Sequence, residues 1–140
     1  MMREIVQGST RPMPGLDITP LVASGRQLIE GYGEGRFRVA GQVFSGSVLV
    51  FPERTLAWPV REPAQITLAS LDAVTGGDVS IEILLVGCGA RFEPAPAGLA
   101  RTLRAAGVAL EWMDTGAACR TFNVLLGEDR RVAAALIAVE

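Results

Sequence analysis

Apolar and polar residues alternate along the first half of the chain, as they do in half-buried β-strands. The alternation runs through residues 37–43 and again through 56–60, with a compact apolar run at 48–51 between them. A glycine cluster at 31–35 supplies a turn ahead of them. Pro59 has no amide donor and favours an edge or terminal strand. The pattern predicts that this half of the chain forms a small antiparallel sheet.

A different pattern begins at residue 79. The segment 79–87 becomes continuously apolar, which is typical of a strand covered on both faces, and we place it at the sheet centre. Apolar positions at helical spacing from Leu99 to Ala106 predict a helix that Gly107 ends. Residues 108–113 then predict a second strand. The connection is long enough for a right-handed parallel crossover.

The last part of the chain predicts one more helix and one more strand. Asp114 or Thr115 can cap the helix, and Gly127 ends it. The alanine content of 131–139 permits a helix, but its valine and isoleucine content favours a returning strand. The chain is therefore predicted to have an α/β fold with a C-terminal βαβαβ block and a small N-terminal antiparallel sheet.

The sequence predicts one domain preceded by an arm. Residues 1–20 contain three prolines and few periodic apolar positions, which is typical of an extended arm. Residues 21–140 contain no repeat, low-complexity segment or long linker. With 49% hydrophobic and 20% charged residues, this part can bury a core as a single domain.

The composition of the chain argues against several classes of function. A net charge of −2, with arginine as the only basic residue type, gives no field that attracts nucleic acid. The absence of histidine and the presence of two cysteines argue against a zinc site, a disulfide scaffold and the commonest general base, so we expect no metal and no cofactor. The longest apolar run, 132–139, is too short for a membrane span, and the N-terminus lacks a secretory signal, so a cytoplasmic protein is predicted.

A candidate ligand site lies at the carboxyl ends of the strands that end at Gly87 and Met113, where open α/β sheets usually bind ligands. Paired glycines permit close approach of an anion, and a carboxylate, hydroxyls and guanidinium groups follow nearby. A small-molecule or anion-binding domain, or an enzyme, could use this set. Its members are Gly87, Cys88, Gly89, Arg91, Asp114, Thr115, Arg120 and Asn123.

Structural roles compete with each of these assignments. Pro94 and Pro96 delete amide donors that a phosphate loop would use, so a plain turn is the favoured interpretation. Asp114 can cap a helix while Arg120 and Asn123 bond neighbouring backbone. The cysteines can serve as small buried hydrophobic residues. Without a base, no catalytic residue is assigned.

Several segments, taken in order, resemble one known family. The resemblance extends from about Tyr32 to the C-terminus and rests on Tyr32-Gly33-Glu34-Gly35-Arg36-Phe37, Gly46-Ser47-Val48-Leu49-Val50, Trp58, Glu82-Ile83-Leu84-Leu85-Val86-Gly87-Cys88-Gly89, Met113-Asp114-Thr115 and Arg120-Thr121-Phe122-Asn123-Val124-Leu125. These segments are similar to the complex I assembly-factor-3-like family. Phe122 stands where tyrosine is common in that family.

The resemblance carries expectations for fold and function. It implies a three-layer α/β domain with a central mixed sheet, and it makes the last segment a strand. Mitochondrial members act through protein contacts, and related bacterial members have no defined biochemical activity, so no catalytic residue carries over. The expected function is non-enzymatic protein binding or an assembly role, with a protein partner or self-association through an apolar edge strand such as 56–58.

Overall fold

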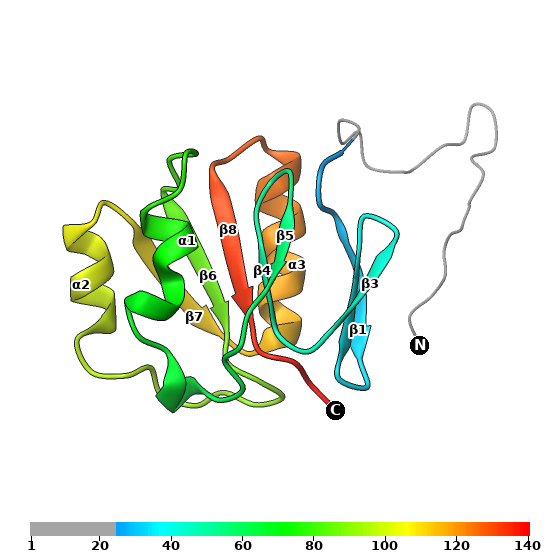
Figure 1. Ribbon diagram of the computed structural model, residues 1–140, viewed down its shortest axis with the longest axis horizontal. Helices are drawn as coiled ribbons and strands as arrows, with labels where there is room; N and C mark the ends of the chain where they lie inside the picture. Colours follow the sequence, from blue (N-terminus) through cyan, green and yellow to red (C-terminus); the bar gives the residue numbers. More distant parts are fainter. Residues whose placement is uncertain (1–24) are drawn as a thin grey trace.

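A computed structural model describes residues 25–140 of the chain (Figure 1). The predicted arm, residues 1–20, lies outside the described residues. A central sheet has the order β5-β4-β8-β6-β7. Its strands are β4 (Val48–Val50), β5 (Thr55–Ala57), β6 (Ile83–Gly87), β7 (Ala109–Met113) and β8 (Val132–Leu136). Strand β4 is antiparallel to β5 and β8, whereas β6 is parallel to β7 and β8, so the predicted mixed sheet is confirmed.

The predicted βαβαβ block is also confirmed. Helix α2 (Leu99–Ala105) connects β6 to β7, and α3 (Thr115–Gly127) connects β7 to β8. The last segment is a strand, and this strand occupies the sheet centre that we assigned to 79–87. The whole of β8 is buried, whereas β6 lies one position further out, because the chain returns between β6 and β4. A short α1 (Asp72–Thr75) follows the 3-10 turns Pro63–Gln65 and Ala69–Leu71.

The small antiparallel sheet exists, but its predicted membership was partly wrong. It contains β1 (Ile29–Gly33), β2 (Arg36–Val39) and β3 (Gln42–Ser45). The segments predicted at 48–51 and 56–60 instead supply β4 and β5 of the central sheet. The physical reason is that a local pattern of apolar residues identifies a strand without identifying its partner, and β4 has both faces covered.

Two apolar cores give the domain its three layers. On one face of the central sheet, Leu84 and Val86 belong to the same core as Leu71 of the second 3-10 turn, Val74 of α1 and Leu103 of α2. On the other face, Leu85 packs with α3 and the small sheet. Figure 1 shows the central sheet between these groups of elements. Full burial of one such aliphatic side chain contributes about 1.5–3 kcal/mol, so the two cores provide the main stabilisation of the layers.

Both hairpins of the small sheet turn through two residues with positive φ. The first turn has Glu34 at φ 54° and Gly35 at 73°, and the second has Ala40 at 49° and Gly41 at 81°. Two-residue hairpin loops need this left-handed conformation at both positions when they follow the type I′ geometry. Alanine pays a steric cost there that asparagine and glycine reduce.

We therefore expect Ala40→Asn to stabilise the protein by about 0.5–1 kcal/mol, because asparagine tolerates the left-handed backbone. Gly41→Ala is the matched control. An added Cβ at residue 41 meets nothing within 4 Å, so its cost of about 1 kcal/mol would come from backbone conformation alone. Urea unfolding measures both changes. A lower unfolding free energy for Ala40→Asn would contradict this account of the turn.

Candidate functional site

The carboxyl ends of β6, β7 and β8 meet at one edge of the central sheet, where Gly87 is aligned with Met113 and Leu136. A Cβ on Gly87 would lie 2.7 Å from Cα of Thr115 and 3.1 Å from the Leu136 side chain. Only glycine therefore lets the first turn of α3 sit against the end of β6. The predicted glycine is required by a close approach between protein segments.

Thr115 joins three segments at this edge. Its side chain is fully buried. The hydroxyl donates to the carbonyl of Ile137 over 2.8 Å and accepts from the amide of Gly89 over 3.0 Å. The Thr115 amide donates in turn to the Gly89 carbonyl over 2.9 Å. Thr115 thus bonds the start of α3 to the loop after β6 and to the residue after β8.

Asp114 and Asn123 also bond backbone groups. Oδ1 of Asp114 accepts from the Ala117 amide over 2.9 Å and so caps α3. The Asn123 side chain accepts from the amide of Ile29 over 2.9 Å and donates to the carbonyl of the same residue over 2.8 Å. Asn123 lies about 12 Å along α3 from Thr115, given the rise per helical residue. It therefore fixes β1 to α3 and does not join the carboxyl-edge group.

The two arginines of the candidate set reach solvent. Both Arg91 and Arg120 are exposed. Within residues 25–140, neither side chain makes an ion pair or a hydrogen bond. The guanidinium of Arg120 lies over the first turn of α3, 3.4 Å from where a Cβ on Gly116 would stand. The structure thus gathers Gly87, Gly89, Asp114, Thr115 and Arg120 near one edge, and ligand binding by this group stays a prediction.

Neither cysteine is presented as a nucleophile. Cys88 and Cys119 are buried free thiols. The Cys88 sulfur accepts from the amide of Glu93 over 3.3 Å. Burial raises the pKa of Cys119 to about 12, an effect that the charge of Arg120 opposes and that of Asp114 reinforces. Because the thiolate is the reactive form, the Cys119 thiol is inert at neutral pH.

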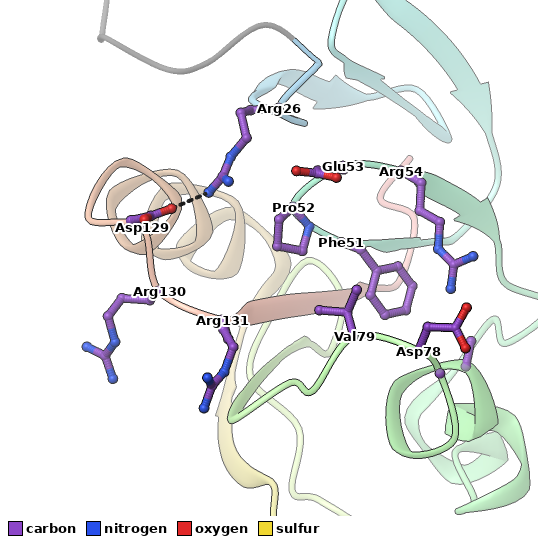
Figure 2. Close-up of a pocket in the computed structure, with 12 residues that line it drawn as sticks. Arg26, Phe51, Pro52, Glu53, Arg54, Asp78, Val79, Asp129, Arg130 and Arg131 are labelled. Atoms are coloured by element: carbon purple, nitrogen blue, oxygen red, sulfur yellow. Dashed lines mark ion pairs between the residues drawn. The ribbon is translucent and has the colours of Figure 1, made fainter.

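A groove lies at the other end of these strands, near the amino ends of β6 and β8, and the sequence did not predict it. It lies between the turn 51–54, the segment 77–79 and the turn 129–131, with Arg26 and Ala73 completing its lining. Its volume is about 430 Å³. Figure 2 shows four arginines around it, from segments far apart in the chain. The only signal in the sequence is the adjacent pair Arg130-Arg131, which does not indicate its neighbours.

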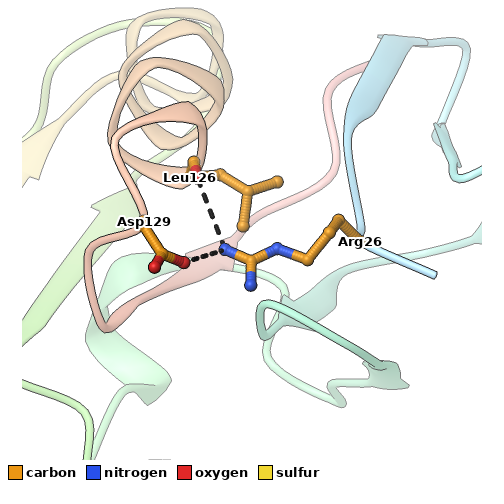
Figure 3. A network of polar contacts seen from close by, with 3 residues as sticks. All are labelled: Arg26, Leu126 and Asp129. Carbon is orange, nitrogen blue, oxygen red and sulfur yellow. Dashed lines mark hydrogen bonds and ion pairs between the residues drawn. The ribbon is translucent and has the colours of Figure 1, made fainter. Parts of the chain in front are cut away.

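Arg26 holds one wall of this groove in place. Its Nη2 donates to the carbonyl of Leu126 over 3.3 Å and lies 3.4 Å from Oδ1 of Asp129 (Figure 3). Leu126 is in the last turn of α3, where carbonyl groups lack helical partners and attract cations. The arginine therefore fixes the turn after α3 to the segment before β1.

Two kinds of feature are absent from the described part of the chain. Residues 25–140 contain no helix with the length and apolar character needed to cross a membrane. They also contain no group of three or more histidine, cysteine, aspartate or glutamate residues placed to hold a metal ion.

The fold defines a three-layer α/β domain, and comparison with known proteins gives its family. The chain belongs to the family described as "Protein of unknown function (DUF498/DUF598)", whose model matches residues 29–137. The match takes in strands β1 to β8 and helices α1 to α3 of the described residues. The family resemblance drawn from the sequence is confirmed, because members of the assembly-factor-3 group are among the relatives.

Individual relatives come from bacteria and animals. The chain is 43% identical to an uncharacterised protein of Rhodobacter capsulatus over 78% of this chain and 82% of that protein. It is 37% identical to NADH dehydrogenase (ubiquinone) 1 alpha subcomplex assembly factor 3 of Danio rerio, over 82% of this chain but 66% of that protein. The chain thus spans slightly less than two thirds of that assembly factor's length.

A solved structure agrees with the fold. The crystal structure of a Bartonella henselae protein described as an outer membrane protein matches with a TM-score of 0.76 and 40% identity. The match covers 83% of this chain and 98% of that one.

The Thr115 hydroxyl is expected to contribute strongly to stability. Thr115→Val keeps the shape but leaves the Gly89 amide and the Ile137 carbonyl without this partner, so the unfolding free energy should fall by about 2–3 kcal/mol. Thr115→Ser is the control. It keeps the hydroxyl and loses one methyl group, so it should cost about 1 kcal/mol. Equal costs for both variants in urea unfolding would refute the role of the hydroxyl.

Burial of Cys119 predicts a pH dependence. Its pKa is about 12 in the folded chain and near 9.0 ordinarily, so the unfolded chain releases this proton first as pH rises. The Cys119 contribution should therefore fall with pH between these values, by up to about 1.4 kcal/mol per pH unit. Cys119→Ala should unfold with a shallower loss over that window. The test compares urea unfolding of the two proteins from pH 8 to 11, and parallel curves would contradict it.

Proposed function

We propose that this chain is a non-enzymatic protein-binding domain with an assembly-factor-like role, acting in the cytoplasm through a protein partner or a second copy of itself. The observation that carries the proposal is the use of Asp114, Thr115 and Asn123 in backbone hydrogen bonds. These side chains stabilise the fold, so they are not available as a reactive set. The names of the animal relatives support an assembly role.

Self-association is one form that this binding could take. The outer edges of β5 and β7 terminate the central sheet, and the outer edge of β3 terminates the small one. Such edges offer unpaired amide and carbonyl groups to another strand. On β3, Val43 is an exposed apolar residue beside such an edge. Light scattering on the purified full chain distinguishes a second copy from a different partner.

A second candidate function is anion binding at the carboxyl edge of the sheet. The observation that favours it is the pair of exposed arginines, Arg91 and Arg120, in the loop after β6 and in α3. Their charges would attract a phosphate or carboxylate group. This function requires Arg91 and Arg120, whereas protein binding at another surface does not.

One experiment separates the two candidates. The tagged full chain and the variant Arg91→Gln/Arg120→Gln are expressed at low level in the native cells, and complexes are captured gently. We expect a stoichiometric protein partner, or a second copy, with both proteins, because the double substitution changes only exposed charges. Orthophosphate titration followed by amide NMR is the parallel measurement, and we expect no saturable shifts.

The reverse result rejects the protein-binding proposal. That result is recovery of the monomer alone, together with saturable phosphate binding or small-molecule turnover that the double variant loses.

A further inference from the structure

The groove between residues 51–54, 77–79 and 129–131 has the size of a small-molecule site. Its volume of about 430 Å³ falls within the range of roughly 300–1,000 Å³ that ligand pockets occupy. A specific protein interface needs roughly 800 Å² of surface from each partner, which a groove of this size does not supply by itself. The dimensions therefore favour a small ligand over a protein chain.

The floor of the groove is apolar. Phe51 and Pro52 come from the turn 51–54, Ala73 from α1 and Val79 from the segment 77–79. Val79 is 57% exposed, which places a large apolar side chain in contact with water inside a concavity. Water contact with such a surface is unfavourable, so an apolar group that displaces it gains free energy. The floor thus suits the hydrocarbon part of a ligand.

Three of the four lining arginines already have partners. Arg26 bonds Leu126 and pairs with Asp129. The guanidinium groups of Arg130 and Arg131 lie 3.6 and 3.0 Å from the two carboxylate oxygens of Glu82. In Figure 2 both side chains extend away from the apolar floor. These arginines are therefore occupied in holding the turn after α3.

Arg54 differs from the other three. Within residues 25–140 it makes no ion pair and no side-chain hydrogen bond. Its guanidinium carbon lies 5.0 Å from the centroid of the Phe51 ring, a cation–π arrangement visible in Figure 2. This contact places the guanidinium beside the ring, and within residues 25–140 its N–H donors have no hydrogen-bond partner. A planar fork of this kind matches a carboxylate bidentately.

We propose that this groove binds a small amphipathic carboxylate. The carboxylate pairs with Arg54, and the apolar body lies on Val79 and Pro52. Glu53 and Asp78 line the same groove, so their charges weaken the attraction for one carboxylate and oppose a second acidic group on the ligand more strongly. The class is therefore a monocarboxylate with a compact hydrocarbon part. The site is separate from the carboxyl edge and goes beyond the proposed protein binding.

The test is a titration of the full chain with 3-phenylpropanoate, followed by amide NMR. We expect saturable shifts at Arg54, Gly77 and Val79. The neutral probe 3-phenylpropanamide should bind about tenfold more weakly, because it lacks the charge-assisted hydrogen bonds. Acetate, which lacks the apolar body, should give no saturable shift at the same concentrations.

Variants make the assignment specific. Arg54→Gln should weaken 3-phenylpropanoate binding about tenfold, and Arg54→Lys should fall between Arg54→Gln and the wild type because it keeps the charge without the fork. Asp78→Asn should strengthen binding, because it removes a competing negative charge. Arg101→Gln is the matched control, since Arg101 is an exposed arginine of α2 outside the groove, and it should bind as the wild type does. Unchanged amide spectra away from the groove verify that each variant is folded.

Three results would overturn the proposal: no saturable shifts, equal affinity for the acid and the amide, or shifts centred on Gly89 and Thr115. Partner capture by the Arg54→Gln variant keeps this outcome separate from the proposed function. If the Arg54→Gln variant loses 3-phenylpropanoate binding but still captures a partner, the result supports the groove site alone. If the wild type binds 3-phenylpropanoate but captures no partner, the result rejects only the protein-binding proposal.

Discussion

The close approach of the first turn of α3 to the end of β6 sets the position of every other element on that face of the sheet. It requires a residue without a side chain at Gly87 and a short hydroxyl side chain at Thr115. Because the hydroxyl both donates and accepts, it also determines where the loop after β6 and the chain after β8 run. A longer side chain at either place would separate the helix from the strands and open the core beneath it.

The position of α3 in turn determines the third layer. The alanines at 133, 134 and 135 give β8 small side chains, and Ala134 lies in the core that includes α3 residues, so α3 can approach the central strand closely. Asn123 then presents an amide that matches the backbone of Ile29, and this pair attaches the small sheet to the helix. Burial of Phe37 and Phe122 completes that interface. The polar side chains of α3 are thus part of the packing between layers.

Local periodicity was enough to predict the βαβαβ block, because each helix and strand there is defined by its own residues and caps. The partners of the strands could not be predicted in this way, since the apolar run 48–51 and the alternating segment 56–60 have the same sequence whether they pair with β3 or with β8. Asn123 and Ile29 are 94 positions apart, so no spacing rule connects them. The groove was invisible for the same reason, because Arg26, Arg54 and Arg131 meet only after the sheet has formed.

The two edges of the central sheet differ in how their polar groups are used. Ligand binding at the carboxyl ends of parallel strands depends on amides that the fold leaves unpaired. Here the Gly89 amide bonds Thr115, the Cys88 amide bonds the carbonyl of Met113, and the start of α3 is capped by Asp114. Those donors therefore stabilise the fold and are not available to a ligand. At the opposite ends of these strands, where the groove lies, Arg26, Arg130 and Arg131 form ion pairs within the fold. Arg54 instead lies beside the Phe51 ring in a cation–π contact. Such a contact does not use the N–H donors of the guanidinium, so they can bind a ligand.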